Sequence, residues 1–226
     1  MRGDDEKRRA VAEIESYLAA QRTARPSVAL AAARSPKAAA TIAHILAAGH
    51  RVFIRDGHAG LSLRKVADEA GVAVGNVSYY FETKRALIEA VLCEALADYI
   101  EEHIRHFEAD RQSPLEILLN VVEFYVSNAR TSNALFFHMW GFAASDPAAK
   151  ALIRKLYRPI GRFIYFLVRA ARPDASESRT REIVLQLFSL EEGVKLFIGM
   201  GPDDNPALAS AESHIRDLAR RIVLAD

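Results

Sequence analysis

The sequence has one cysteine, Cys93, among its 226 residues, and its formal net charge is only +1. A single cysteine excludes an intramolecular disulfide and suits the cytoplasm, where thiols stay reduced. No apolar run is long enough to span a bilayer, so no transmembrane helix is expected. The near balance of charge excludes a polycation, and any surface that binds nucleic acid must therefore be local.

Strand-like alternation of Val, Ile and Thr is also absent, whereas helix-forming residues dominate and 50% of the chain is hydrophobic. The first ten residues, MRGDDEKRRA, lack the apolar segment of a secretion signal. These features predict an all-α protein with a sizeable core. The length fits one larger all-helical domain or a small domain joined to a larger one.

Residues 1–35 are expected to form an N-terminal extension. Val11, Ile14 and Leu18 recur at helical spacing, which predicts a short helix up to about Ala20. A connector with two prolines follows. The favoured interpretation is a solvated, partly ordered tail, and the alternative is a basic arm that touches a phosphate backbone or a partner subunit.

A compact helical domain is predicted for residues 36–83. Ser35 and Pro36 have the pattern of an N-cap followed by proline at the first helical position. This helix is expected to end near Gly57 and Gly60, which tolerate positive φ.

Two short helices then predict a helix-turn-helix motif. The first runs from an N-cap at Ser62 to Ala70, Gly71 allows the turn, and the second covers Val74 to Tyr80. Val66, Ala67, Ala70, Val72, Val77 and Phe81 are the predicted inner residues.

The remaining face of the second helix suits a DNA groove. Gly75 would let a backbone approach closely, and the amide of Asn76 can pair with a base edge. The hydroxyls of Tyr79 and Tyr80 can reach phosphates, and Lys84 adds a positive charge at the start of the next helix. Packing of the tyrosines against the preceding helix is the alternative for either residue alone.

The segment LSLRKVADEAGVAVGNVSYYFETKRALIEAVL, Leu61 to Leu92, resembles the DNA-binding domain of the TetR family of bacterial transcriptional repressors. The features that carry the resemblance are the alanine-and-glycine turn, the YYF triplet, and Lys84 three residues after Phe81, with Leu87 on the following helix. The resemblance implies a dimer that binds a palindromic operator and is released by a small-molecule effector.

The resemblance also implies a role for particular residues. Positions that face the major groove are Val74, Gly75, Asn76 and Tyr79, and phosphate-contact positions are Ser62, Tyr80 and Lys84. Arg64 stands at a position that can reach a base or a phosphate. Two residues depart from the common pattern: Ser78 stands where many relatives carry tyrosine, and Val74 stands where a polar or basic residue is common. Base contact at Val74 is therefore expected to be apolar, against a thymine methyl group.

Residues 84–226 are predicted to form a helical ligand-binding and dimerisation domain. The predicted helices are 84–107, 114–128, an aromatic-rich helix ending near Ala144, 147–172, 179–199 and 206–224.

No constellation of catalytic residues is present, so the chain is not expected to be an enzyme, and no cofactor is expected. Cys93 lies on the apolar side of its helix, where packing is the expected role. His103 and His106 are spaced to share a metal ion, but they lack a clear third ligand, so no metal site is predicted.

Aromatic and soft side chains are concentrated in the segment NALFFHMWGFA. Ligand pockets in helical bundles are mostly apolar, and together with the family resemblance this indicates a small apolar or aromatic effector. The predicted ligand-binding residues are Tyr125, Phe137, His138, Trp140, Tyr165 and Phe166. Ordinary core packing is the alternative for each of them.

The last two helices carry apolar rows with charged edges, which suit a four-helix interface between two subunits. The predicted contact residues are Leu187, Leu190, Val194, Ile215 and Leu218, and burial within one subunit is the alternative for each.

In the predicted mechanism, two recognition helices spaced by about 34–36 Å bind the operator. An effector releases DNA because it prefers the arrangement that does not bind. The same fold used as an activator or as a ligand-independent repressor is the first alternative. A helical-bundle enzyme or lipid carrier is the second.

Overall fold

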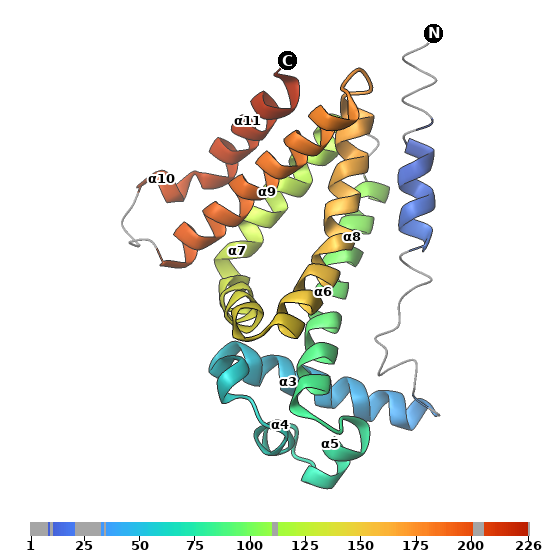
Figure 1. Cartoon of the computed structure of the whole chain (residues 1–226), viewed down its shortest axis with the longest axis vertical. Coiled ribbons are helices and arrows are strands. Elements are labelled where there is room, and N and C mark those ends of the chain that lie inside the picture. The colour runs from blue at the N-terminus through green and yellow to red at the C-terminus, as the bar shows by residue number, and fades with distance from the viewer. Residues whose placement is uncertain are drawn as a thin grey trace. The chain divides into compact units, whose positions relative to one another are not determined.

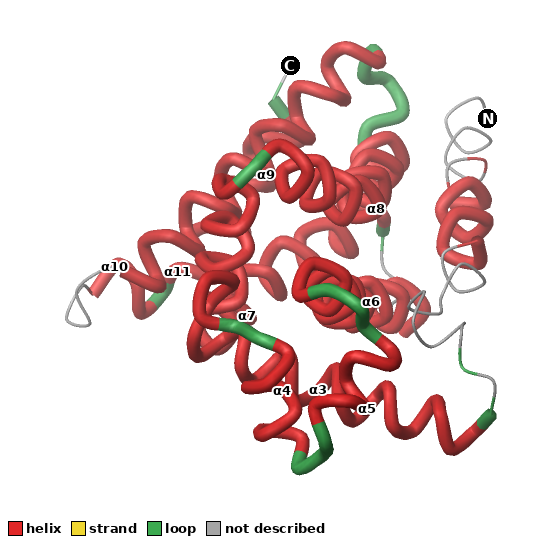
Figure 2. The backbone as a smooth tube through the Cα atoms, turned by 60° about the horizontal axis from the view of Figure 1, so that its bottom comes forward, coloured by secondary structure: helices red, strands yellow, loops and turns green. Residues whose placement is uncertain are grey.

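A computed structural model of the chain is drawn in Figure 1. It describes residues 9, 11–20, 33, 35–109, 113–200 and 206–225, except for the side chains of 98–100, 102–104 and 106–109. All regular structure in these ranges is helical and is joined by short loops, with no strand among them (Figure 2). The all-α prediction is confirmed.

Residues 11–20 are helical, and nine further helices follow in the described ranges. They are α3 (Pro36–Gly60), α4 (Leu63–Ala70), α5 (Val74–Tyr80), α6 (Lys84–Ala109), α7 (Pro114–Ser145), α8 (Pro147–Ala171), α9 (Glu177–Met200), α10 (Pro206–Ala209) and α11 (Ala211–Leu224).

The ends of α3 show why local sequence places them there. The Ser35 hydroxyl accepts a hydrogen bond from the backbone N–H of Ala38 at 3.2 Å, and Pro36 occupies the first turn. Near the other end, Gly57 has φ 66° and ψ −177°, a conformation that breaks the helical path. Gly60, the second predicted breaker, has no positive φ.

Two predicted boundaries are wrong. The helix expected to end at Asn128 and the aromatic-rich helix after it are one continuous helix, α7, because no proline or glycine separates them and the Ser132 hydroxyl donates to the Asn128 carbonyl within the turn. The helix expected over 206–224 is instead divided at Ser210, whose φ of −117° and ψ of 24° separate α10 from α11.

The chain forms two compact units. One contains residues 1–22, 101–133 and 157–226, and will be called the bundle unit; the other contains residues 23–100 and 134–156, and will be called the reading unit. Helices α6, α7 and α8 each begin in one unit and end in the other. The functional division into residues 1–35, 36–83 and 84–226 stays a prediction.

In the bundle unit, α9 and α11 pack side by side (Figure 1). Apolar side chains such as Ile183, Leu187 and Val223 are buried there. Arg216 of α11 donates to the carboxylates of Glu116 and Glu123 on α7 at 2.8 and 3.0 Å, which ties the two helices together.

The N-terminal helix, residues 11–20, also belongs to the bundle unit. Ile14 and Leu18 are buried, and the Tyr17 hydroxyl donates to the Pro159 carbonyl oxygen of α8 at 2.8 Å. The interpretation of residues 1–35 as a solvated tail is therefore wrong for this helix. Its apolar residues recur on one side, and packing against α8 removes them from water.

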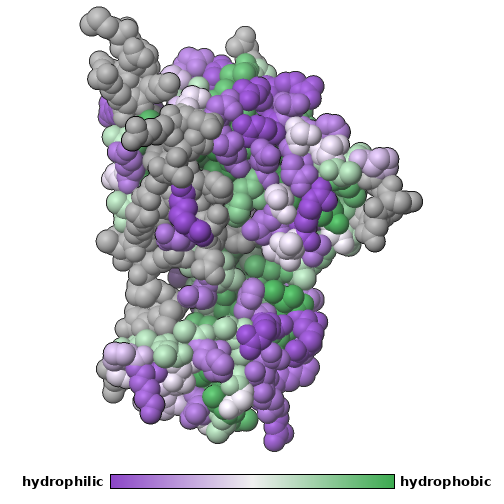
Figure 3. All heavy atoms as spheres, turned by 180° about the vertical axis from the view of Figure 1, so that it is seen from behind, coloured by the Kyte–Doolittle hydropathy of each residue, from purple (hydrophilic) through white to green (hydrophobic). Residues whose placement is uncertain are grey.

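The face drawn in Figure 3 is mostly hydrophilic, and hydrophobic atoms emerge only in separate small areas. No helix in the described part of the chain is long and apolar enough to cross a membrane.

Candidate nucleic-acid interface

Polar contacts and buried apolar side chains both join helices α3 and α4. A ring nitrogen of His44 lies 2.8 Å from the carbonyl oxygen of Ala70 at the end of α4. Arg51 and Arg55 of α3 both donate to the Glu69 carboxylate of α4, at 2.8 and 3.0 Å. Val66 is fully buried beneath them. These contacts hold α4 in a fixed position against α3.

Both ends of α4 are capped as predicted. The Ser62 hydroxyl accepts a hydrogen bond from the Lys65 N–H at 3.2 Å. At the other end, Gly71 has φ 65° and ψ 32°, and the Val72 N–H donates back to the Ala67 carbonyl at 3.0 Å. This left-handed cap turns the chain sharply, so that α5 begins three residues later.

Helix α5 separates its apolar from its polar side cleanly. Val77 and the following Phe81 are buried. Tyr79 is 75% exposed, and Val74 is 38% exposed. A Cβ atom added at Gly75 would meet no other atom within 4 Å, so the backbone there is open to an approaching ligand.

Arg64 and the predicted groove residues Val74, Gly75, Asn76 and Tyr79 are all exposed. The rings of Tyr79 and Tyr80 meet edge to face, with centroids 5.0 Å apart. This contact restricts the ring of Tyr79, a residue that is otherwise exposed.

The predicted phosphate-contact residues already have partners in the protein. The Lys84 ammonium donates to the Ala59 carbonyl oxygen at 3.0 Å, and the Ser62 hydroxyl serves as the cap of α4. Both groups keep donor capacity, because an ammonium has three hydrogens and a hydroxyl that accepts can also donate. The contacts within the protein therefore fix the Lys84 ammonium and the Ser62 hydroxyl in place and leave each of them able to donate a hydrogen bond.

Two acidic groups close to the motif, Asp56 and Glu69, are paired with cations. Hydrogen bonds from Lys65 and then Arg55 lower the pKa of Asp56, and hydrogen bonds from Arg51 and Arg55 lower the pKa of Glu69. Helix α5 itself carries no charged side chain. The outward face therefore presents hydrogen-bonding and apolar groups without a negative charge that would repel phosphates.

Residues 45–91 match the sequence family described as bacterial regulatory proteins, tetR family. The match covers the end of α3, all of α4 and α5, and the start of α6, which are the elements just described. The DNA-binding segment of the chain is thus similar in sequence to the tetR family over residues 45–91. This similarity supports a DNA-binding transcriptional regulator, and the family's members are not enzymes.

Relatives agree with this assignment over most of the chain. The HTH-type transcriptional regulator BetI of Burkholderia thailandensis is 28% identical over 179 residues, which cover 78% of this chain and 91% of BetI. FadR from Bacillus subtilis, solved with stearoyl-CoA, has a TM-score of 0.67 at 17% identity, covering 78% of this chain and 96% of that one. A transcriptional regulator from Saccharomonospora viridis, solved with choline, also has a TM-score of 0.67 at 16% identity, covering 78% and 94%. At these identities the two structures show the TetR-type fold alone.

The residues predicted to bind an effector fall into both units. Phe137, His138 and Trp140 belong to the reading unit, and Phe137 and Trp140 have ring centroids 5.8 Å apart. Tyr165 and Phe166 belong to the bundle unit, where their rings lie 5.8 Å apart. Their role in ligand binding stays a prediction.

The sixth predicted effector residue, Tyr125, lies in a buried charged cluster of the bundle unit. The Lys195 ammonium is 5.2 Å from the centroid of the Tyr125 ring, and it contacts the carboxylates of Glu191 and Glu192. Burial raises the pKa of Glu191 to about 7, and the nearby Lys195 charge opposes that rise. This cluster was not predicted from the sequence, although Glu191 and Lys195 stand four apart on the buried stripe of α9.

The residues predicted for the dimer interface differ in exposure. Leu187 and Ile215 are buried within the chain, Leu190 and Val194 are half-buried, and Leu218 is exposed. More exposed apolar side chains lie nearby on α9, at Leu185, Leu196, Phe197 and Met200.

The reading unit contains a further contact that sequence analysis missed, between α3 and the end of α7. His138 packs against Gly57, where an added Cβ would lie only 2.7 Å from the imidazole Nδ1. Its ring also meets Phe53 edge to face at 6.0 Å, and His58 meets Phe142 at 5.6 Å. The pairs are about 80 residues apart in the chain, so no local pattern could have revealed them.

Among the described residues, neither Cys93 nor a cluster of metal-ligating side chains forms a further functional site. Burial is the main cause of the raised pKa of the Cys93 thiol, which makes it a poor nucleophile. Within the described ranges no cluster of three histidine, cysteine or acidic residues is placed to hold a metal ion. The side chains of His103 and His106 lie outside the described residues.

Proposed function

We propose that this protein is a TetR-family, ligand-responsive transcriptional repressor of the cytoplasm. Two copies bind a palindromic operator through α5, and a small effector releases them. The observation that carries the proposal is the outward face of α5, where Tyr79 is 75% exposed beside an open Gly75 while Val77 holds the helix from beneath. An exposed aromatic residue on a rigid, uncharged helix favours insertion into a groove lined by phosphates.

Specific roles follow for the exposed residues. Asn76 would read a base edge, and Val74 would contact a thymine methyl group. Ser62, Arg64, Tyr79, Tyr80 and Lys84 would fix the protein on the phosphate backbone or adjacent base edges.

Replacing Tyr79 with alanine is expected to weaken operator binding about tenfold for each half-site, because a hydrogen bond to a charged group contributes ~1.5–3 kcal/mol. The thermal midpoint should stay the same, since the side chain is largely in solvent. A gel-shift titration against the DNA upstream of the protein's own gene measures the affinity.

Ser78→Ala is the matched control on the same helix. The Ser78 hydroxyl donates to the Val74 carbonyl at 3.1 Å, so its loss should leave DNA binding unchanged. Equal affinity of Tyr79→Ala and wild type would refute the assignment of this face to DNA.

The proposed dimer interface combines α9 and α11. Leu185, Phe197 and Met200 are each about two-thirds exposed on α9, and Leu218 is exposed on α11. Apolar groups so exposed on a helix pair are typical of an isologous contact between two copies. Leu187 and Ile215 would then support the interface from inside the subunit.

Replacing Phe197 with aspartate is expected to convert the dimer to a monomer, because a buried unpaired carboxylate in each copy would oppose association. Sedimentation velocity measures the change in mass. Tyr79→Ala, an equally exposed aromatic position on α5, should remain dimeric. A Phe197→Asp protein with wild-type association would place the interface elsewhere.

Effector binding is supported by the ligand-bound structures of similar fold, one with stearoyl-CoA and one with choline. We propose that a small apolar or aromatic effector binds among the predicted residues Tyr125, Phe137, His138, Trp140, Tyr165 and Phe166. Release of a bound operator by such a compound, measured by fluorescence anisotropy, tests this part of the proposal.

A further inference from the structure

Helix α8 contains a weak turn at Pro159. Proline in a helix interior has no N–H to donate, so the carbonyl of Lys155 four residues earlier loses its usual partner. The helix nevertheless runs without interruption from Pro147 to Ala171. The segment 155–159 will be called the Pro159 turn.

The position of this turn coincides with the boundary between the two units. Residues 134–156 belong to the reading unit, and the bundle unit resumes at residue 157. The boundary therefore crosses α8 inside the Pro159 turn. A helix that is weakened where it leaves one compact unit for another is suited to bend there.

On the reading-unit side, the start of α8 is anchored to α6. Asp146 accepts a hydrogen bond from the Ala149 N–H at 2.9 Å and so caps α8. The same carboxylate forms an ion pair with Arg85 in the first turn of α6, directly after the helix-turn-helix motif. Ala149 and Ile153 are buried in this part of α8.

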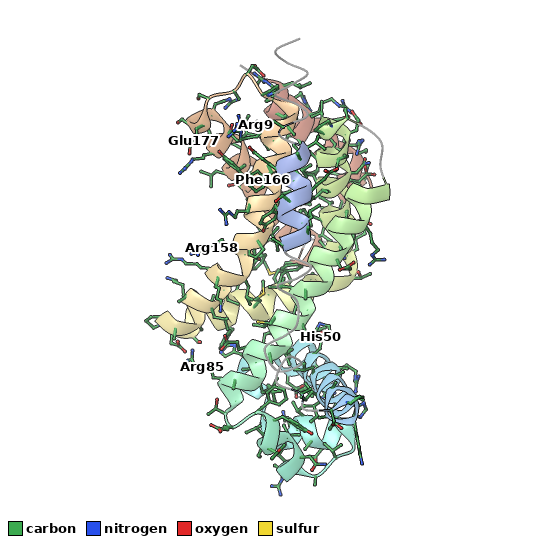
Figure 4. The ribbon with its side chains drawn as sticks, turned by 90° about the vertical axis from the view of Figure 1, so that its right-hand side faces the viewer. Arg9, His50, Arg85, Arg158, Phe166 and Glu177 are labelled. Carbon is green, nitrogen blue, oxygen red and sulfur yellow. The ribbon has the colours of Figure 1, made fainter. Side chains whose placement is uncertain are left out.

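On the bundle side, the N-terminal helix is attached to the turn itself. The Tyr17 hydroxyl donates to the Pro159 carbonyl, and the Tyr17 ring lies 5.4 Å from that of Phe166 one and a half to two turns further along α8. Figure 4 shows the N-terminal helix beside α8 near the labelled Phe166, with Arg158 marking the level of the turn. Burial raises the pKa of Tyr17 to about 12, so the hydroxyl remains a donor at any physiological pH.

We propose that the N-terminal helix is an intramolecular brace that keeps the Pro159 turn of α8 straight. Ile14 and Leu18 supply the docking energy, and Tyr17 joins the brace to the turn. With the brace docked, the Pro159 turn keeps its helical conformation. With the brace released, the turn opens, and this opening is expected to change operator binding. This last consequence rests on the proposed function, whereas the brace itself does not.

Amide hydrogen exchange of the full chain, followed by mass spectrometry, tests the brace. Tyr17→Phe should raise the exchange rate of the amides of 157–163, Pro159 having none, about fivefold, the population factor of one net hydrogen bond. The double variant Ile14→Ser/Leu18→Ser should raise it at least ~tenfold, since it also removes the buried apolar contacts. Tyr79→Phe, an exposed tyrosine on α5, is the matched control and should change nothing in α8.

Pro159→Ala restores the missing hydrogen bond and should make α8 independent of the brace. In that background, Ile14→Ser/Leu18→Ser should leave the exchange of amides 157–163 unchanged. The proposal is overturned if the N-terminal helix exchanges freely in the serine variant while amides 157–163 stay as protected as in wild type. The proposal is also overturned if, in the Pro159→Ala background, Ile14→Ser/Leu18→Ser still raises the exchange rate of amides 157–163.

Gel-shift titrations with the same proteins separate this inference from the proposed function. Ile14→Ser/Leu18→Ser should change operator affinity in the wild-type background and should leave it unchanged in the Pro159→Ala background. If no protein, including wild type, binds any duplex, the proposed function fails while the exchange results still decide whether the brace exists.

Discussion

Gly57→Ala is expected to lower the free energy of unfolding by about 3 kcal/mol. Gly57 has φ 66° and ψ −177°, a region of backbone space open almost only to glycine. An added Cβ would also lie 2.7 Å from the His138 ring. Backbone strain and a steric clash with His138 would therefore both destabilise the folded protein when alanine replaces Gly57. Urea denaturation followed by circular dichroism measures the loss.

Gly71→Ala is the matched control, because Gly71 also has a positive φ. Its ψ of 32° places it in the left-handed helical region, and an added Cβ there would meet nothing within 4 Å. Its expected cost is only about 1 kcal/mol. Adding His138→Ala to Gly57→Ala should recover the part due to the clash. Equal losses for the two glycine variants would contradict the described packing of His138 on Gly57.

Lys195→Met is expected to lower the free energy of unfolding by about 3 kcal/mol at pH 8, because it leaves the buried Glu191 carboxylate without its cation. The loss should be smaller at pH 5, where Glu191 can take up a proton. Urea denaturation at the two pH values measures the difference.

The sign of the pH effect follows from the raised pKa of Glu191. Its folded-state pKa of about 7 lies above the ordinary value of 4.5, so folded protein binds the extra proton between these values. The contribution of Glu191 to the free energy of unfolding has its full value below pH 4.5 and is lost as the pH rises through about 7. Lys195→Met removes the charge that opposes the rise, so the loss of stability continues to higher pH and its total is larger.

Glu191→Gln added to Lys195→Met is the control for this second prediction. With the carboxylate gone, the double variant should recover most of the stability at pH 8 and lose the pH dependence. A Lys195→Met protein equally destabilised at pH 5 and pH 8 would show that loss of packing, and not an unpaired charge, is responsible.

The helix-turn-helix could be predicted because its determinants are local. The cap at Ser62, the left-handed Gly71 and the inward Val77 all act within a few residues of the elements they define. The outward position of Tyr79 followed from the same short-range pattern.

The long-range contacts could not be predicted in this way. Tyr17 and Pro159 are 142 residues apart, and nothing near either residue indicates the other. The continuity of α7 was missed because Asn128 and Ser132 are weak helix formers, although their side chains bond within the helix. The buried stripe of α9 contains the charged Glu191 and Lys195, and the apolar rows seen in its sequence did not indicate that these two residues face inward.

Equilibrium binding of the wild-type protein to a fluorescent duplex from upstream of its own gene, measured across a salt series, tests the central claim most directly. We predict two chains per duplex and a logarithm of the binding constant that falls linearly with the logarithm of salt concentration, with competition by an unrelated duplex much weaker. The absence of binding at low ionic strength, or equal binding of every duplex, would contradict the account.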